Sequence, residues 1–134
     1  MVASVAYVSG CTSIESSCSV NAAIAAENEA SSLRNWAAMY ESFRRYRYCD
    51  DGAVAEGYGE SVSKLLAEQW ETLSDLQDRI AMELAFQTFV VHHINEMSNR
   101  VRIDRIEKNA SERCPPNAKQ LCDEIIVAVR KVKK

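Results

Sequence analysis

The chain has 134 residues, of which 47% are hydrophobic and 26% are charged, and its formal net charge is −3. This length suits one compact domain and is too short for two. Four glycines and two prolines exclude collagen-like and proline-rich disordered chains. The mild acidity argues against a nucleic-acid binder, which usually carries a basic face. No apolar run approaches the roughly 20 residues that span a bilayer, so we expect a soluble folded domain.

The chain contains more cysteines than a cytosolic protein of this size usually carries. The five are Cys11, Cys18, Cys49, Cys114 and Cys122. Because no Cys-x-x-Cys occurs, zinc fingers and thioredoxin-like motifs are not supported. The last two flank a Pro-Pro-Asn turn and are placed to close a small disulfide loop if the protein is exported. In a cytosolic protein they would instead be buried thiols on separate helix faces.

The N-terminal segment bears on the cellular compartment. Residues 2–8 are small and apolar and lead into the tetrad Val8-Ser9-Gly10-Cys11. This tetrad resembles the lipobox of bacterial lipoproteins, in which a signal peptide is removed before a cysteine that then carries the lipid. The resemblance implies that residues 1–11 are a truncated signal segment, that Cys11 is the lipid attachment site, and that the protein lies in the periplasm or cell envelope. No Lys or Arg precedes the short apolar run, so either the true start lies upstream or the match is coincidental.

Lipidation of Cys11 would leave an even set of disulfide candidates, namely Cys18, Cys49, Cys114 and Cys122. Four cysteines allow three connectivities. We expect a bridge from Cys49 to Cys114 or Cys122, because all three lie in the folded part of the chain.

Residues 12–30 contain no aromatic residue and are rich in Ser, Ala and Glu. Such a segment buries too little apolar area to offset its ordering entropy, which predicts a flexible tether. The alternative is a first helix over the Ala-rich residues 22–30. Residues 31–134 show helical periodicity and are predicted to form one helical domain.

The first helix of that domain is expected to begin at Ser31 or Ser32, either of which can cap it. Its apolar face consists of Leu33, Trp36, Ala37, Tyr40 and Phe43. Arginines at 44, 45 and 47 end it, where cations complement the helix dipole. A phosphate-binding cluster is the functional alternative.

The second helix is expected to start after Asp50 or Asp51 and to bury one face, made of Val54, Tyr58, Val62, Leu65, Leu66 and Trp70. Gly57 and Gly59 lie inside it, and each costs about 1 kcal/mol relative to alanine. A close approach of another helix, a kink or a break would explain them.

A third helix is predicted to begin near Ser74, which has capping-box spacing with Gln77. The clearest amphipathic stripe follows, made of Phe86, Phe89, Val90, His93, Ile94 and Met97. Periodicity leaves open whether residues 81–85 interrupt the helix.

Two further helices are predicted, one capped by Asn99 and one by Asn117. Their inward residues are Ile103 and Ile106, followed by Leu121, Ile125, Ile126, Val129 and Val132. No sustained period-2 run is present, so we expect an all-α, single-domain bundle of five to six short helices, stapled by disulfides. Its aromatic core would comprise Trp36, Tyr40, Phe43, Tyr58, Trp70, Phe86 and Phe89.

No common catalytic motif occurs in the sequence, and we predict no catalytic residue, cofactor or metal. His93 lies on an apolar stripe, which favours a hydrogen-bonded core histidine over a catalytic base. His92 and Glu96 are four residues apart and can share a helix face, but two side chains are too few for a metal site.

The most distinctive segment, residues 49–60, concentrates carboxylates, glycines and one aromatic residue. Its acidic side chains are Asp50, Asp51, Glu56 and Glu60. Helix capping explains the first two, and the last two would repel each other without cations nearby. The functional interpretation is a surface for a basic partner; a cation site is the weaker alternative.

Several runs carry a resemblance to a known group. They are Cys-Asp-Asp-Gly-Ala-Val-Ala-Glu-Gly-Tyr-Gly-Glu-Ser-Val at 49–62, Trp70-x-x-Leu73, Phe89-Val90-Val91-x-His93-Ile94, and the stretch from Asn109-Ala110 to Cys114-Pro115. Together they resemble small uncharacterised exported, lipobox-containing helical proteins of proteobacteria, a resemblance that brings no known activity. In size, helicity, export and disulfides the chain is also weakly similar to periplasmic immunity proteins that protect bacteria from cell-wall amidases.

Two functional hypotheses follow. The first is a non-enzymatic exported protein, either a periplasmic protein-binding module of inhibitor or immunity type or an envelope lipoprotein, which contacts a protein partner and meets the membrane only through a lipid anchor. The alternative is a small envelope-acting hydrolase that uses Glu56, Glu60 and His93, which requires these side chains to converge in one cleft.

Overall fold

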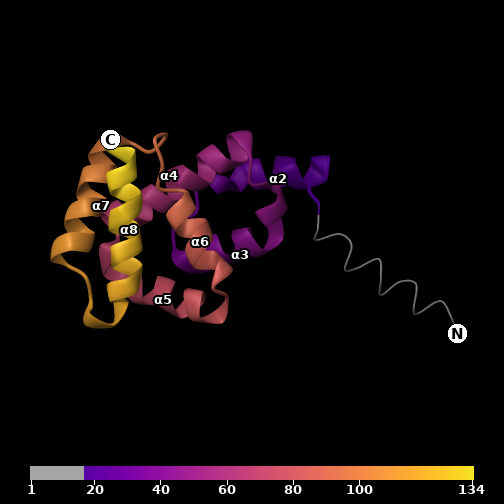
Figure 1. Ribbon diagram of the computed structural model, residues 1–134. Helices are drawn as coiled ribbons and strands as arrows, with labels where there is room; N and C mark the ends of the chain where they lie inside the picture. The colour runs from indigo at the N-terminus through magenta and orange to yellow at the C-terminus, as the bar shows by residue number, and fades with distance from the viewer. Residues whose placement is uncertain (1–16) are drawn as a thin grey trace, which may run out of the picture.

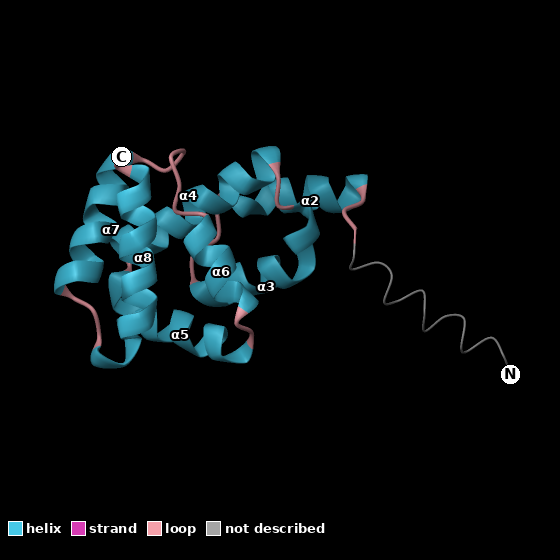
Figure 2. Ribbon diagram, viewed as in Figure 1, coloured by secondary structure: helices cyan, strands magenta, loops and turns pink. Residues whose placement is uncertain are grey.

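The computed structural model describes residues 17–134, and within that range every regular element is a helix (Figure 2). The α-helices are α2 (Val20–Ala30), α3 (Trp36–Tyr46), α4 (Gly52–Glu68), α5 (Leu73–Met82), α6 (Ala85–His92), α7 (Arg100–Glu112) and α8 (Lys119–Val132). Short 3₁₀ turns cover Arg47–Cys49, Trp70–Thr72 and Pro116–Ala118. The all-α prediction is therefore confirmed, while the expected five to six helices fall short of the seven in the described range.

Helix α4 lies at the centre of the arrangement (Figure 1). It packs against α2 on one side and α7 on the other, and α7 and α8 lie side by side at the far end of the molecule. Helix α3 packs against α5 and α6, and α6 in turn packs against α8. These contacts enclose one core.

The predicted aromatic residues supply much of that core, and all seven are buried. Phe86 is fully buried and lies 5.1 Å from the Tyr40 ring and 5.2 Å from the Phe43 ring, centroid to centroid. Each tryptophan keeps its polar atom satisfied: the Trp36 indole donates to the Thr72 hydroxyl, and the Trp70 indole to the Arg113 carbonyl. Burial therefore costs these rings no hydrogen bond.

The tether prediction needs correction, because Val20–Ala30 is a helix whose N-terminus is capped by the Ser19 side chain. Its inner face buries Ala26 and Ala30 completely, so small residues stabilise it by close packing on α4 rather than by bulk. The alternative of an Ala-rich first helix is the one observed. The lipobox-like segment 1–11, its Cys11, and residues 12–16 of the expected tether lie outside the described residues.

Two disulfides staple the fold. Cys18 pairs with Cys49 across a sequence separation of 31, and Cys114 pairs with Cys122 across a separation of 8. The small loop around the Pro-Pro-Asn turn is thus present. The expected bridge from Cys49 to Cys114 or Cys122 is wrong, because the helical α2 brings Cys18 to the 3₁₀ turn that contains Cys49.

The disulfides indicate that the protein folds in an oxidising, extracytoplasmic compartment. Between residues 17 and 134, none of the helices combines the length and the apolar character needed to cross a membrane.

Several predicted helix boundaries shift by a few residues. Asp51 caps α4 and Asn99 caps α7, as expected. Helix α3 is capped by Asn35 rather than by Ser31 or Ser32. Helices α5 and α8 begin after Thr72 and Ala118 and have no side-chain cap, so the predicted caps Ser74 and Asn117 do not act as such. A 3₁₀ turn leads directly into each of these helices and replaces a capping side chain.

The stripe from Phe86 to Met97 ends earlier than its spacing indicates. Helix α5 ends at Met82 and α6 begins at Ala85, so the open question over residues 81–85 is answered by a break. Helix α6 then ends at His92, because the Asn95 side chain donates to the His92 carbonyl and turns the chain away. Met97 is consequently 70% exposed rather than in the core.

Candidate functional site

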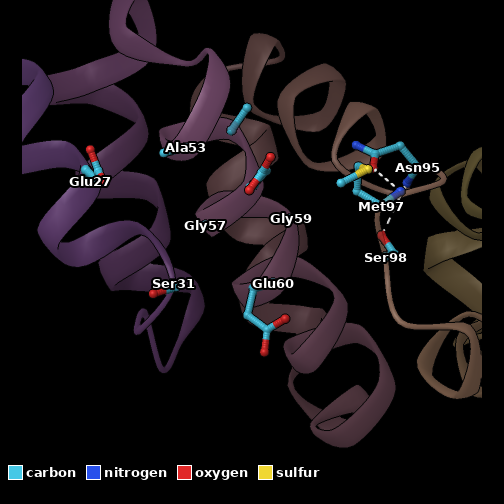
Figure 3. A pocket seen from close by; sticks show the side chains of 11 residues that line it. Glu27, Ser31, Ala53, Gly57, Gly59, Glu60, Asn95, Met97 and Ser98 are labelled. Atoms are coloured by element: carbon cyan, nitrogen blue, oxygen red, sulfur yellow. Dashed lines mark hydrogen bonds between the residues drawn. The ribbon is translucent and has the colours of Figure 1, made fainter.

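An open cleft of about 520 Å³ lies between α2, α4 and the turn at residues 93–99 (Figure 3). We call it the acidic cleft, because its charged lining residues are Glu27 from α2 and Glu56 and Glu60 from α4. The remaining lining residues are small or neutral, namely Ser31, Ala53, Ala55, Gly57, Gly59, Asn95, Met97 and Ser98. Among residues 17–134, no lysine, arginine or histidine lines the cleft.

Two of the three glycines of α4, Gly57 and Gly59, line the cleft, and Gly57 lets α2 pack closely on α4. A Cβ on Gly57 would lie 2.7 Å from the Ala30 Cβ, so only glycine lets α2 approach this closely. The helix contact is held by Ser61, whose hydroxyl donates to the Ala30 carbonyl at 2.6 Å and accepts from the Leu33 backbone N–H at 3.2 Å. The expectation that close approach of another helix compensates for a glycine in α4 is met at Gly57, and the same two helices form two walls of the cleft.

The turn at residues 93–99 forms the third wall, and a local hydrogen-bond network fixes its shape. The Asn95 side-chain oxygen accepts from the Met97 N–H at 3.0 Å, and the Asn95 N–H donates to the Ser98 hydroxyl at 3.3 Å (Figure 3). Because one side chain satisfies several backbone groups, this wall is positioned without regular secondary structure.

The three carboxylates of the acidic cleft are unequally neutralised. Glu60 lies 3.0 Å from Arg102 and 3.9 Å from Lys64, which removes the repulsion expected between Glu56 and Glu60. Glu27 and Glu56 form no ion pair with any residue from 17 to 134. Both are exposed, so the cleft presents uncompensated negative charge to solvent.

The four predicted partner-surface residues separate into two pairs. Glu56 and Glu60 line the acidic cleft, whereas Asp50 and Asp51 do not. Asp51 caps α4 by accepting from the Gly52 N–H, so its role is structural. Glu27 was not predicted as a site residue, because residue 27 fell in the segment interpreted as a tether. Its position on one face of an Ala-rich helix was the available signal.

Asp50 serves a different purpose, because its carboxylate lies 2.9 Å from His93 Nε2. The other ring nitrogen, Nδ1, lies 2.6 Å from the Phe89 carbonyl, and the His93 side chain is 1% exposed. His93 is thus a hydrogen-bonded core histidine. It does not line the acidic cleft with Glu56 and Glu60, so the three residues of the hydrolase hypothesis do not converge.

Tyr58 packs edge-on against His93 in the same core region. Burial raises its pKa to about 12, and the hydrogen bond between its hydroxyl and that of Ser42 only partly opposes this shift. The phenol is therefore neutral at physiological pH and acts as a buried hydrogen-bonding group.

A second concavity, which we call the apolar groove, has a volume of about 900 Å³ and lies between α6, the turn at residues 93–99 and α8. Its lining includes Val91, Ile94, Met97, Val127, Ala128 and Val132, with His92 and Glu96 among the polar residues at its edge. In the part of the chain that the structure describes, no group of three or more histidine, cysteine, aspartate or glutamate side chains is placed to hold a metal ion.

Two of the three arginines at the end of α3, Arg44 and Arg47, are engaged with nearby side chains. Arg47 pairs with Glu83 at 2.6 Å and lies 4.2 Å from the centre of the Phe43 ring. Arg44 lies 3.7 Å from Glu41. These contacts favour the interpretation as helix-end charges over a phosphate-binding cluster.

No protein-family model matches this chain, and no curated protein or solved structure matches it either. The resemblances to exported proteobacterial proteins and to amidase immunity proteins therefore stay predictions.

Proposed function

We propose that this protein is a non-enzymatic binding module of the bacterial periplasm or cell envelope, and that its acidic cleft receives a basic segment of a protein partner. The observation that carries the proposal is the charge of the cleft: three glutamates line about 520 Å³ of open space, and among residues 17–134 two of them (Glu27 and Glu56) form no ion pair and no cationic side chain lines the cleft. A lysine or arginine side chain is long enough to enter such a cleft and would find carboxylates on two walls.

The construction of the cleft supports binding by a preformed surface. Two of its walls are joined by the Ser61 hydrogen bonds to Ala30 and Leu33, and the Cys18–Cys49 bridge fixes α2 to the turn before α4. A preformed site loses little conformational entropy when the partner binds. Inhibitor and immunity proteins need such a surface, since they act by covering a partner rather than by chemistry.

The proposed location rests on the disulfides and on the lipobox resemblance. An anchor at Cys11 would place the domain at the membrane surface, with no transmembrane helix required. Intact mass after expression with the native upstream region tests this part: a diacylglyceryl addition supports the anchor, and an unmodified Cys11 contradicts it.

The binding proposal is tested with the oxidised full chain and an array of nine-residue peptides that carry a central arginine or lysine, followed by fluorescence anisotropy of the tightest binders. We expect Glu56→Gln combined with Glu60→Gln to weaken binding at least tenfold. The matched control is Glu71→Gln combined with Glu112→Gln, which removes the same charge from exposed positions outside the cleft.

The control pair should change the affinity less than twofold. An equal loss with both pairs would mean that the peptides respond only to net charge, and the cleft would not be the site. Failure of every basic peptide to bind would also overturn the proposal.

A further inference from the structure

One wall of the apolar groove carries opposite charges at equal distances from the midpoint of a strip of four side chains. Glu124, Val127, Ala128 and Lys131 line the groove from α8, together with Gln120, Val132 and Asp123, whose carboxylate is paired with Lys119. The spacing of the first four, i, i+3, i+4 and i+7, places this strip on one face of the helix, in a sector roughly 100° wide. Both charged residues are exposed, and Val127 is 55% exposed. Along the helix, this strip runs from an acid through an apolar and a small residue to a base.

Neither Glu124 nor Lys131 takes part in an ion pair with residues 17–134. The ion pairs of the α8 region use other residues, namely Lys119, Asp123, Arg130 and Lys133. Positions four residues away on the same helix hold only uncharged side chains (Gln120, Val127 and Ala128). The two charges are therefore available to a molecule that enters the groove.

We propose that the apolar groove is the contact surface between two copies of this chain, related by a twofold axis that passes between Val127 and Ala128. In two antiparallel α8 helices that cross there, a residue before the midpoint meets the residue equally far after it in the other copy. Glu124 of each copy then meets Lys131 of the other, and Val127 meets Ala128. Such self-complementarity is what an isologous dimer requires.

The apolar side chains around the strip suit the same occupant. Ala128 is small and only 9% exposed, so a second helix can approach at the 8–10 Å typical of packed helices. Met97, at the side of the groove, is 70% exposed and flexible enough to fill an irregular gap. A second copy buries both Val127 and Met97 and supplies the opposite charge at both ends of the strip.

This inference is independent of the proposed function, which concerns the acidic cleft. Asn95 and Met97 line both concavities, but Glu27, Glu56 and Glu60 do not line the apolar groove. Dimerisation and peptide binding can therefore succeed or fail separately.

Sedimentation equilibrium of the oxidised full chain tests the dimer through a charge exchange. Glu124→Lys and Lys131→Glu each place like charges opposite one another, and each should raise the dimer dissociation constant at least tenfold. The two substitutions on one chain restore both pairs and should return the constant to within threefold of the original. An equimolar mixture of the two single variants should form a heterodimer, because every pair across its interface is again of opposite charge.

Glu112→Lys and Lys108→Glu are the matched controls, since they make the same charge changes on exposed positions of α7 outside the groove. They should alter the dissociation constant less than twofold, and circular dichroism verifies that every variant is folded. A wild-type chain that stays monomeric up to about 1 mM, a concentration at which even complexes with millimolar dissociation constants form, would overturn the proposal. So would single variants that fail to associate with each other, because the groove would then accept some other occupant, such as residues 1–16 or an unrelated partner.

Discussion

Replacing Gly57 by alanine tests whether the contact between α2 and α4 is as close as the structure indicates. The added Cβ would lie 2.7 Å from the Ala30 Cβ and 3.1 Å from the Ser31 backbone nitrogen. An ordinary carbon–carbon contact is roughly 3.5–4.0 Å, so α2 would have to move. The Cys18–Cys49 bridge and the hydrogen bond from Ser61 to Ala30 both oppose that movement.

Two opposing effects determine the size of the change in stability. Alanine gains about 1 kcal/mol over glycine in a helix interior. Overpacking a tight contact costs about 1–3 kcal/mol, and the upper part of that range applies, because the nearest atoms belong to a Cβ and to backbone rather than to a flexible side-chain end. We therefore expect Gly57→Ala to lower the free energy of unfolding by about 1–2 kcal/mol.

Urea unfolding of the oxidised protein, followed by far-ultraviolet circular dichroism, measures this change. Gly59→Ala is the matched control, because its Cβ would lie 3.5 Å from the His93 carbonyl oxygen, an ordinary contact. This control should be neutral or stabilising by up to about 1 kcal/mol. If Gly57→Ala is as stable as Gly59→Ala, helix propensity alone decides both positions and the argument from close packing is refuted.

Three further predictions concern the core and its staples. Removing the Cys18–Cys49 bridge by serine substitution should lower the free energy of unfolding by about 3–4 kcal/mol. This loss should exceed that from removing the Cys114–Cys122 bridge by roughly 1 kcal/mol, because the Cys18–Cys49 bridge closes a longer loop. Urea unfolding measures both losses, and a larger loss from removing the Cys114–Cys122 bridge would contradict the prediction. The folded protein holds the Tyr58 pKa near 12 against 10.0 for the unfolded chain, so the contribution of the neutral Tyr58 to the free energy of unfolding is complete below pH 10 and declines as the pH rises toward 12. Unfolding midpoints measured across this interval check the decline, and an absorbance titration of the tyrosines should lose its highest-pKa component in Tyr58→Phe. Asp50→Ala should lower the free energy of unfolding by about 1–3 kcal/mol, since it leaves a buried His93 nitrogen without a partner. Asp50→Asn keeps an oxygen acceptor and should lower it less. Equal losses from the two variants would show that the hydrogen bond contributes little.

The helical class and the core could be predicted because they depend on local periodicity. Helices α7 and α8 repeat large apolar residues at helical spacing, and Asn99 is a cap that acts within its own turn. The glycines of α4 predicted a close neighbour for a local reason as well, since a helix interior does not otherwise favour glycine. The sequence did not identify that neighbour, because the contact joins Gly57 to Ala30 across a span of chain that periodicity does not describe.

The predicted disulfide partner of Cys49 was wrong for a related reason. Helix α2 buries only alanines against α4, so its apolar pattern is weak and composition favoured a tether. A tether leaves Cys18 unplaced, and the cysteines near the C-terminus then become the obvious partners. Recognising Ser19 as a helix cap would have placed Cys18 next to a folded element and favoured its bridge to Cys49 among the three possible connectivities.

The turn at residues 93–99 explains why the shape of the two concavities was not predicted, although a partner surface containing Glu56 and Glu60 was. Its spacing of His93, Ile94 and Met97 continues the apolar stripe of α6, and an extended helix would have carried Met97 into the core. Asn95 instead bonds to the backbone of His92 and Met97 and ends the helix, as asparagine does when it competes with helical hydrogen bonds. The chain that leaves α6 then forms one wall of the acidic cleft and one wall of the apolar groove. If α6 is assumed to continue through Met97, the turn at residues 93–99 is absent from the predicted fold. One wall of the acidic cleft and one wall of the apolar groove are then absent with it, since both concavities depend on where this single turn lies.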